Sequence, residues 1–490
     1  MRLGPGQLPD PQPAGLPAEG RARRILLIVH QFFPQFHHGT ETISERTARA
    51  LAAMGYGVDI VTSVLVDRKF LSGILESPLC PPEARALLTQ PEVPLAQGFT
   101  YPYAEGIRVH AFTHSHDPKH GIPRFRREVA EPAIEVLVAS LLAAGRYERA
   151  IVFHQLHIPD RALRLIRRRG VPISFVATDF FAVCPIGSQQ FEDGRPCAGP
   201  GPASLHCVRH LSDQRGWLKW LQDGLPTRLT ALGLILYRWL GPWPRLRVHP
   251  YQNLWYLLER NHRARHFLRG CDLLVAPSSR IERSLVAAGA SRHRLRREAY
   301  GMPAPTARPA RAHLSDPEIR LCFAGVINER KGLHVLLDAL GRLPADLPPW
   351  RLDIWGDFGH GADYAARERE RAVAFGARVR LAGTFPSYEV HAVLGRYDYL
   401  VIPSTWAENL PLILLSALQI GLPVIISDAE GLMDAFPDGR VFGRSFRMGD
   451  AGDLARILAE EIRARPLYDP AAAPRVPTVE EFAATLLGRG

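Results

Sequence analysis

Short runs of apolar residues alternate along most of the chain with longer segments whose apolar residues recur at helical spacing. Continuous apolar runs bounded by turn residues are typical of strands that are buried on both faces of a parallel sheet. The pattern therefore predicts repeated strand–helix units of an α/β fold. Strands are predicted at 23–30, 56–63, 106–112, 149–154, 171–178, 271–279, 319–325, 350–356, 379–383, 399–404 and 423–426, and helices at 42–54, 124–144, 280–288, 333–343 and 478–487.

Two segments interrupt the alternation. Residues 64–105 are rich in Pro, Leu and Glu and are interpreted as irregular. The segment Trp217–Tyr256 holds five of the eight tryptophans, interleaved with arginines, and predicts a helical insertion at about 213–262. One interpretation of this composition is an interfacial helix that makes a peripheral contact with a membrane. The other is a helical subdomain packed on the N-terminal sheet.

The chain of 490 residues is long enough for two or three domains. Residues 1–22 contain repeated Pro and Gly with little apolar periodicity, and we interpret them as a disordered leader. The strand–helix units then divide at a proline-rich linker, 303–309. The predicted organisation is an N-terminal domain at 23–302, a C-terminal domain at 303–475 and a crossover helix within 476–490.

Composition and charge restrict the function classes. The net charge of +11 favours an anionic partner, such as nucleic acid, an anionic membrane surface or a phosphorylated small molecule. No zinc-finger or RNA-binding motif accompanies the charge, so we do not expect nucleic-acid binding. The six cysteines are scattered and follow no cleavable apolar segment, which predicts reduced thiols and a cytoplasmic protein. No apolar run reaches the roughly 20 residues that a membrane-spanning helix needs.

Three cysteines and two histidines lie close together in the sequence, at Cys184, Cys197, Cys207, His206 and His210. These residue types can bind zinc, but their spacing lacks the paired Cys-x-x-Cys arrangement of zinc knuckles. The spacing therefore favours a loop with free thiols.

A single acid, Glu408, lies between the predicted strands 399–404 and 423–426. Ligands of parallel sheets bind beyond the carboxyl ends of the strands, where helix N-termini favour phosphate. A carboxylate would repel phosphate there, so Glu408 is expected to accept hydrogen bonds from the hydroxyl groups of a bound sugar. The alternative is a solvated loop acid.

Lys331 is one of only four lysines and precedes Gly332 at the start of a predicted helix. An ammonium group at this place would neutralise a bound diphosphate as its leaving-group charge grows. The alternative is an ordinary surface lysine. A glycine also precedes the first predicted helix, in the sequence His38-Gly39-Thr40-Glu41, and would allow a close approach of backbone and ligand.

Taken in order, these segments resemble the retaining GT-B glycosyltransferases of family four, whose fold has two Rossmann-like domains facing a cleft. The resemblance covers about 23–63, 149–210 and 266–460 and is most specific in the C-terminal half. It implies catalytic roles for Lys331 and Glu408, with Arg330 substituting for the arginine that the family places at Val326. The donor-binding residues that it implies are Gly39, Thr40, Gly325, Asn409 and Ser416, and the sugar or acceptor contacts that it implies are Thr178 and Asp179. A helix that begins at Leu410 is also expected to complement the charge of the donor phosphate. His154 lies just past a predicted strand, where it is expected to contact substrate; the alternative is an ordinary loop or packing role.

Three positions depart from the family pattern. Thr178 replaces a histidine, Val326 an arginine and Ser416 the second glutamate of the family signature. The resemblance still implies a retaining glycosyltransferase that moves a sugar from a nucleotide-sugar donor to a glycan, lipid-linked or other acceptor in bacterial surface polysaccharide or glycoconjugate synthesis. No metal or other cofactor is expected. The alternative is a non-catalytic GT-B scaffold or the partner subunit of an active transferase.

Overall fold

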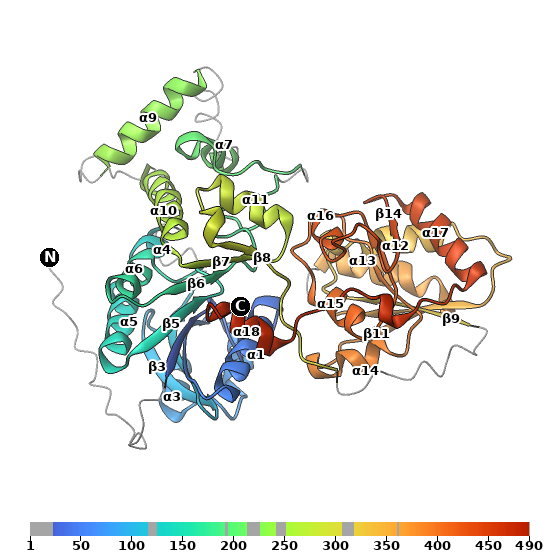
Figure 1. Ribbon diagram of the computed structural model, residues 1–490, viewed down its shortest axis with the longest axis horizontal. Coiled ribbons are helices and arrows are strands. Elements are labelled where there is room, and N and C mark those ends of the chain that lie inside the picture. The colour runs from blue at the N-terminus through green and yellow to red at the C-terminus, as the bar shows by residue number, and fades with distance from the viewer. Residues whose placement is uncertain are drawn as a thin grey trace.

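The computed structural model describes residues 23–115, 125–191, 195–212, 226–241, 251–305, 318–359 and 362–489. The chain folds into two α/β units that lie side by side in Figure 1, each built on one sheet. The predicted leader at 1–22 and part of the linker at 303–309 lie outside the described residues.

The first sheet has the strand order β3-β4-β2-β1-β5-β6-β7-β8, and its pairings are parallel except for the edge strand β3. Alternate residues of β1 enter different cores: Ile25 and Leu27 pack with one set of helices, and Leu26 and Ile28 with the other. The sheet is therefore buried on both faces, as the continuous apolar runs predict. Its elements are β1 (Arg24–Ile28), α1 (Gly39–Ala53), β2 (Gly57–Leu65), α2 (Arg68–Leu75), α3 (Pro82–Leu88), β3 (Gly98–Ala104), β4 (Ile107–His114), α4 (Arg126–Val129), α5 (Pro132–Ala144), β5 (Tyr147–Val152), α6 (Asp160–Arg168), β6 (Ile173–Val176), β7 (Leu273–Ala276), α11 (Ser279–Ala287) and β8 (Leu295–Arg297).

Two expectations for this unit were wrong. Residues 64–105 are not irregular, because they contain α2, α3 and the antiparallel strand β3. The predicted helix at 124–144 is divided into α4 and α5 by extended backbone at Ala130 and Glu131, directly before Pro132. A residue before proline avoids the helical region, which explains the break.

The second sheet is entirely parallel and has the order β11-β10-β9-β12-β13-β14. In sequence order this is the 3-2-1-4-5-6 arrangement of doubly wound nucleotide-binding folds. The order reverses between β9 and β12, so a crevice is expected beyond the carboxyl ends of these two strands. The elements are β9 (Ile319–Ala324), α12 (Leu333–Leu340), β10 (Trp350–Trp355), α13 (Ala362–Val373), β11 (Val379–Gly383), α14 (Val390–Leu394), β12 (Tyr399–Ile402), α15 (Leu412–Gln419), β13 (Val424–Ser427), α16 (Glu430–Met433), β14 (Gly443–Phe446) and α17 (Ala451–Ala464).

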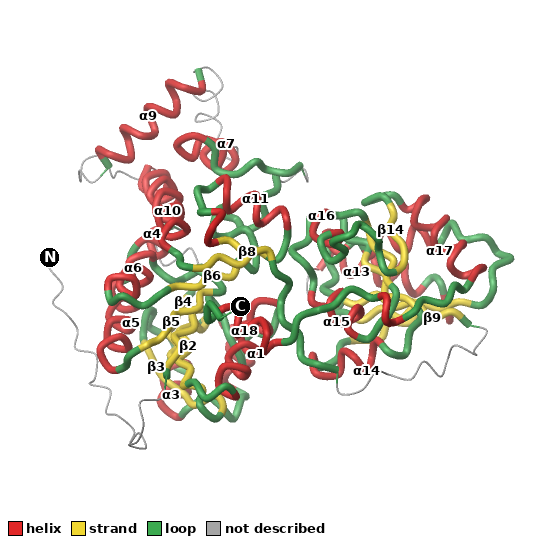
Figure 2. The backbone as a smooth tube through the Cα atoms, in the orientation of Figure 1, coloured by secondary structure: helices red, strands yellow, loops and turns green. Residues whose placement is uncertain are grey.

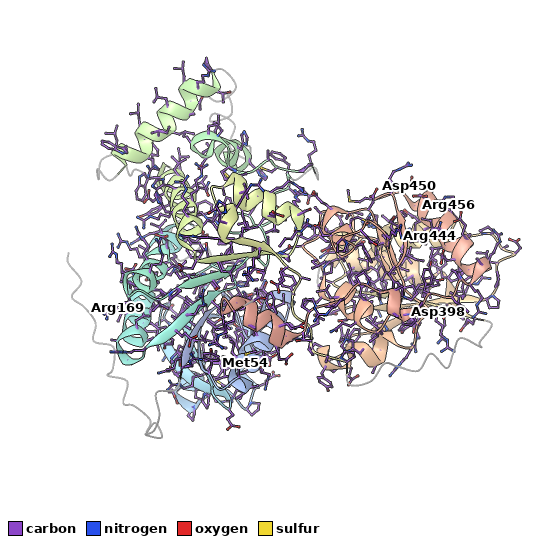
Figure 3. All side chains as sticks on the ribbon, in the orientation of Figure 1. Met54, Arg169, Asp398, Arg444, Asp450 and Arg456 are labelled. Carbon is purple, nitrogen blue, oxygen red and sulfur yellow. The ribbon has the colours of Figure 1, made fainter. Side chains whose placement is uncertain are left out.

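Figure 2 shows the strands of each unit at its centre with helices outside them. Part of the outer surface of the second unit carries ion pairs between charged side chains. Arg444 pairs with Glu460, and Arg456 pairs with Asp453 and Glu460, near the labels in Figure 3. These pairs are exposed, so we expect each to contribute little to stability.

The chain crosses between the units at Tyr300–Met302 and returns in the last helix, α18 (Val479–Leu486). This helix lies beside α1 in Figure 1, and Phe482 packs in the same core as β1. Ser174 of β6 donates a hydrogen bond to the carbonyl oxygen of Leu486 at 2.7 Å. The end of the chain is therefore part of the first unit.

The predicted insertion at 213–262 is described in part. The structure has α7 (Leu205–Ser212), α9 (Thr227–Leu240) and α10 (Tyr251–Gly270) around it, whereas Trp217, Trp220 and Trp243 lie outside the described residues. α9 packs on α7 and α10 and projects away from the first sheet in Figure 1. In the described ranges α9 is packed on its neighbouring helices, whereas the tryptophan-rich insertion as a whole stays a prediction.

Candidate active site at the carboxyl edges of the two sheets

Lys331 lies in the turn between β9 and α12, at the strand that borders the crevice of the second sheet. Asn328 caps a short 3₁₀ turn, Glu329–Lys331, by accepting a hydrogen bond from the backbone N–H of Lys331 at 3.1 Å. Gly332 follows in the left-handed region, with φ of 71°. This backbone turns the chain sharply and directs Lys331 toward the neighbouring strand β12.

Glu408 lies in the loop after β12, on the other side of the same crevice. One oxygen of its carboxylate, Oε1, accepts hydrogen bonds from Lys331 Nζ at 2.8 Å and from Ser404 Oγ at 2.6 Å. The Glu408 residue is only 3% exposed. Ser404 is held in turn, because its carbonyl oxygen accepts a hydrogen bond from Ser427 Oγ at 2.7 Å. The structure thus brings the two predicted catalytic residues into direct contact.

Two glycines allow the backbones around this pair to approach closely. A Cβ atom on Gly332 would lie 1.8 Å from the carbonyl oxygen of Pro403. A Cβ atom on Gly431 would lie 1.7 Å from the carbonyl oxygen of Glu408. Neither distance is possible for real atoms, so any side chain at these positions would push the loops apart.

The remaining predicted residues of this domain lie in different environments. Arg330 stacks on the ring of Trp406, with 5.0 Å between the guanidinium carbon and the ring centroid. Val326 is 56% exposed. A Cβ on Gly325 would meet no atom within 4 Å, so open space lies above this backbone. Ser416 is buried within α15, at 2% exposure.

The prediction that a helix begins at Leu410 was wrong. α15 begins at Leu412 after the cap residue Pro411. Leu410 instead has φ of 55° and is 2% exposed, and its side chain packs in the core cluster that contains β1 and α18. Asn409 also contacts the first domain: its Nδ2 lies 2.6 Å from the carbonyl oxygen of Thr178. The loop after Glu408 therefore crosses to the other domain.

The predicted residues of the N-terminal domain lie after β1, β5 and β6. Gly39 begins α1, and a Cβ there would meet no atom within 4 Å; Thr40 follows in the first turn. His154 Nε2 and Asp179 Oδ2 are 3.0 Å apart. Thr178 uses its hydroxyl internally, because Oγ1 donates to the carbonyl oxygen of Phe153 at 3.1 Å.

Two neighbouring residues of this edge were missed from the sequence. Glu41, in the first turn of α1, is 2% exposed, and its Oε1 lies 3.6 Å from Nε2 of His30. The ring of His30 lies 4.0 Å from the ring of His154, measured between centroids. β1 and β5, which precede the two histidines, are the strands where the order of the first sheet reverses. The signal that could have identified them is a histidine just beyond a buried strand and an acid in the first turn of the helix that follows it.

Burial raises the pKa of Glu41 above its ordinary value of 4.5, while its own backbone and the nearby His154 act in the opposite direction. The group therefore holds its proton to higher pH than an exposed glutamate does. Perturbed carboxylates of this kind cluster at functional sites.

Residues 307–469 match the sequence model of a family described as glycosyl transferases group 1. The matched range contains the second sheet together with Lys331 and Glu408. The chain carries a group 1 glycosyltransferase domain.

Solved structures similar over nearly the whole chain show its fold. Anabaena HepE in complex with UDP and glucose is 14% identical, with a TM-score of 0.51 and coverage of 95% of each chain. Sucrose-phosphate synthase from Thermosynechococcus elongatus is 17% identical, with a TM-score of 0.54 and coverage of 95% of this chain and 94% of the other. The predicted GT-B fold, with two Rossmann-like domains, is confirmed.

Curated relatives of the glycosyltransferase domain match shorter stretches. Phosphatidyl-myo-inositol mannosyltransferase from Propionibacterium freudenreichii is 29% identical over 144 residues, which are 29% of this chain and 34% of the relative. Sulfoquinovosyl transferase SQD2 from Arabidopsis thaliana is 28% identical over 234 residues, which are 45% of this chain and 42% of the relative. The chain thus matches well under half the length of these relatives.

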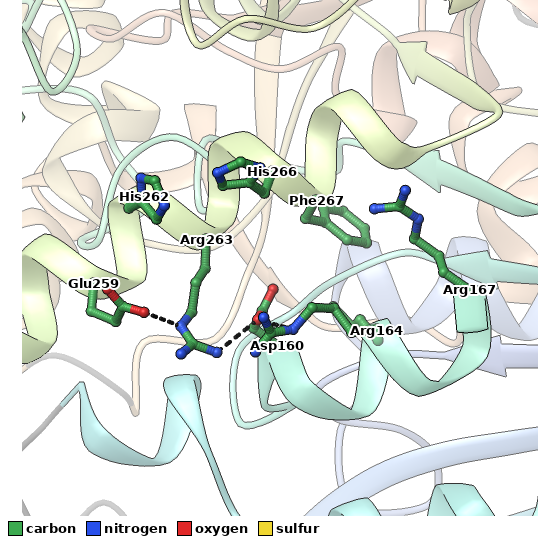
Figure 4. Close-up of a pocket in the computed structure, with 9 residues that line it drawn as sticks. Asp160, Arg164, Arg167, Glu259, His262, Arg263, His266 and Phe267 are labelled. Atoms are coloured by element: carbon green, nitrogen blue, oxygen red, sulfur yellow. Dashed lines mark hydrogen bonds and ion pairs between the residues drawn. The ribbon is translucent and has the colours of Figure 1, made fainter.

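A pocket of about 290 Å³ lies outside the candidate site, between α6 and α10 (Figure 4). Its charges largely compensate one another. Arg263 donates to Glu259 at 2.6 Å and to Asp160 at 3.1 Å, and Arg164 pairs with Asp160 at 2.9 Å. No predicted site residue lines it. We therefore place the candidate site at the sheet edges.

Within the described ranges, no group of three or more His, Cys, Asp or Glu side chains is arranged to hold a metal ion. Cys184, Cys197 and Cys207 are free thiols. Burial raises the pKa of Cys207 to about 12 and also raises that of Cys197, so both are protonated near neutral pH. In the part of the chain that the structure describes, no helix has the length and apolar character to cross a bilayer.

We expect Gly332→Ala to lower the free energy of unfolding by about 2–5 kcal/mol, because it combines a left-handed backbone with the contact at Pro403. The matched control is Gly376→Ala, which has φ of 61° but no atom within 4 Å of the new Cβ. Backbone strain alone should cost this control about 1–2 kcal/mol. Urea denaturation measures both. Equal losses would show that the close approach to Pro403 is unimportant.

A second prediction concerns pH. Because the pKa of Glu41 is raised in the folded state, the folded protein binds this proton more tightly than the unfolded chain does. The resulting stability is fully present below pH 4.5 and is lost as pH rises through the folded-state pKa. Relative to Glu41→Gln, the wild type should therefore lose stability as pH rises from 4.5, and the difference should then level off. Urea titrations at several pH values test this; a difference independent of pH would contradict it.

Proposed function

We propose that this protein transfers a sugar, with retention of configuration, from a nucleotide-sugar donor to a hydroxyl group of a glycan or lipid-linked acceptor in surface polysaccharide or glycoconjugate synthesis. The observation that carries the proposal is the contact of Lys331 with Glu408 at 2.8 Å, between the two strands where the order of the second sheet reverses. Nucleotides bind doubly wound folds at this position.

The two side chains have complementary tasks in this reaction. The bond between the anomeric carbon and the terminal phosphate oxygen breaks, and the acceptor oxygen takes its place on the same face of the sugar. The acceptor proton passes to the departing phosphate. Lys331 stabilises the negative charge that grows on that phosphate. Glu408 accepts hydrogen bonds from donor-sugar hydroxyls, and Arg330 adds positive charge nearby.

In this proposal the other predicted residues make room for the substrates or hold them in place. Gly39 and Gly325 leave open space above their backbones, where the diphosphate and the sugars can approach. The first N–H groups of α1, at Gly39 and Thr40, suit an anion or a hydroxyl oxygen. Asp179 and His154 form the acceptor side, whereas the Thr178 hydroxyl is engaged with Phe153.

Named relatives and neighbours support the substrate classes. Anabaena HepE has been solved with UDP-glucose, a nucleotide sugar. Relatives of the domain include a phosphatidyl-myo-inositol mannosyltransferase and the amylovoran biosynthesis glycosyltransferase AmsK of Erwinia amylovora. UDP sugars are therefore the first donors to test, and lipid-linked and polysaccharide acceptors are both reasonable classes.

We also propose that α9 contacts the cytoplasmic face of an anionic membrane. The inner residues Leu234 and Tyr237 pack with α10, but a second apolar face points outward. A helix that is apolar on both sides normally has a partner on each. The net charge of +11 favours an anionic bilayer as that partner. The exposed apolar residues are Leu229, Leu232, Ile235, Leu236, Trp239 and Leu240.

To test the donor site, we would titrate a panel of nucleotides and nucleotide sugars by calorimetry and measure donor turnover. We expect Lys331→Ala to lower turnover by about 10²–10³-fold, because it removes charge stabilisation of the leaving group. Glu408→Gln keeps the side-chain volume. It should lower the affinity for the nucleotide sugar more than the affinity for the free nucleotide. Lys69→Ala, at an exposed lysine of α2, is the matched control.

Removing Lys331 leaves a buried carboxylate without its cation, so thermal unfolding must show that each variant is folded. Wild-type protein that binds a nucleotide sugar without turning it over would support the non-catalytic scaffold. Absence of binding to every donor at millimolar ligand would contradict the proposed function.

For the membrane contact, the double variant Leu232→Gln/Trp239→Gln should bind vesicles of anionic phospholipid at least about tenfold more weakly, because it removes two apolar side chains from the interface. Leu467→Gln is the control, since Leu467 is 87% exposed on the other domain. Co-sedimentation with anionic and with zwitterionic vesicles measures the effect. Equal binding of wild type and double variant would exclude α9 as the membrane contact.

A further inference from the structure

The side chain of Asn409 contacts the N-terminal domain and the segment that crosses between the domains. Its Nδ2 lies 2.6 Å from the carbonyl oxygen of Thr178, 3.2 Å from that of Ala177 and 3.1 Å from the hydroxyl of Tyr300. Its Oδ1 accepts a hydrogen bond from Ser278 Oγ at 3.2 Å. Both ends of the amide are therefore engaged by the N-terminal domain and the crossing segment.

The residues on either side of Asn409 extend this contact. Glu408 precedes it and binds Lys331. Leu410 follows it and is buried in the core cluster of β1 and α18, in a left-handed conformation with φ of 55°. A bulky residue in this region costs about 1–3 kcal/mol and persists only where the surroundings hold it. The loop after β12 that contains Glu408, here called the Glu408 loop, is thus fixed to the first domain by the polar side chain of Asn409 and the apolar side chain of Leu410.

A second contact between the domains is made by a segment that packs against the same loop. Asp434, directly after α16, accepts hydrogen bonds from the backbone N–H of Ser279 at 2.7 Å and from its hydroxyl at 3.0 Å. A carboxylate from one domain therefore occupies the N-terminus of α11 in the other, where the helix dipole favours it. α16 also contains Gly431, whose backbone abuts the carbonyl of Glu408. These two polar contacts therefore involve segments that adjoin Glu408 in sequence or abut its backbone.

We propose that Asn409 is a positioning residue that ties the Glu408 loop to the N-terminal domain, so that Glu408 is oriented for the donor sugar only while the two domains are held together. The inference rests on the proposed function, because Glu408 must be the residue that binds the sugar. It predicts that the nucleotide, which the C-terminal domain holds, binds independently of Asn409. Sugar transfer, by contrast, depends on it.

The test compares wild type with Asn409→Ala and Asn409→Asp, using UDP for binding and UDP-glucose for turnover. We expect the Kd for UDP to change by less than about twofold and kcat to fall by about 10²-fold, because a small misplacement of a positioned group has this effect. Asn409→Asp should be at least as damaging, since a carboxylate would face the carbonyl oxygens of Ala177 and Thr178. Hydrogen exchange of residues 404–411 should become faster in both variants.

The control is Arg283→Ala, which removes the exposed ion pair between Arg283 and Glu430, another contact between the domains. A surface pair contributes little, so this variant should keep wild-type kcat and exchange. Wild-type kcat and exchange in Asn409→Ala would overturn the proposal. A loss of UDP affinity as large as the loss of kcat would also overturn it, because Asn409 would then be a donor ligand.

Failure of the proposed function gives a different result. If wild type neither binds UDP nor turns over UDP-glucose, and the wider donor panel also fails, the function is wrong. In that case hydrogen exchange alone decides whether Asn409 ties the loop to the first domain: faster exchange of 404–411 in Asn409→Ala but not in Arg283→Ala supports the tie, and unchanged exchange refutes it.

Discussion

The ion pair of Lys331 and Glu408 is the interaction on which the candidate site depends. Glu408 is 3% exposed, and a buried charge is stable only with a cation and further hydrogen bonds around it. Lys331 and Ser404 supply these. Bringing them together requires the turn after β9 and the loop after β12 to touch, which explains the need for glycine at 332 and 431. A bound donor would compete with this pair for both side chains.

The same constraint of parallel sheets organises the N-terminal domain. The strand order reverses between β1 and β5, where ligands are expected to bind, and His30 and His154 lie two residues beyond the ends of these strands. Glu41 and Asp179 lie beside them and are the carboxylates of this edge. Each domain thus presents charged side chains near the ends of its strands, where the N-termini of the following helices offer backbone N–H groups to a ligand. These two edges are the surfaces that a donor and an acceptor would share.

The three departures from the family pattern have different structural contexts. Thr178 donates its hydroxyl to the carbonyl of Phe153, while His154 lies against the neighbouring Asp179 from the adjacent strand. Val326 is exposed, and Arg330 lies four residues later on the ring of Trp406. Ser416 is buried in α15. An imidazole therefore lies against Asp179, the residue after Thr178, and a guanidinium lies four residues after Val326 in the same loop.

Sequence alone determined the features that depend on local pattern. Continuous apolar runs identified the buried strands, because each strand must fill the cores on both faces of its sheet, as alternate residues of β12 do. Lys331 and Glu408 were identifiable because each lies in the loop between such a strand and the helix that follows it. Local rules failed at residues 64–105, where short helices and an edge strand depend on packing, and at Pro132, which was overlooked within an apolar periodic segment.

Only the tertiary structure decided which distant residues meet. Nothing in the sequence pairs Asn409 with Thr178, which lies 231 residues earlier. That contact depends on how the two domains are oriented. For the same reason Leu410, which was expected to begin a helix, is instead held in a left-handed conformation by the core of the other domain. Strands and chemistry follow from residue type and spacing, whereas contacts between domains depend on the geometry of the whole chain.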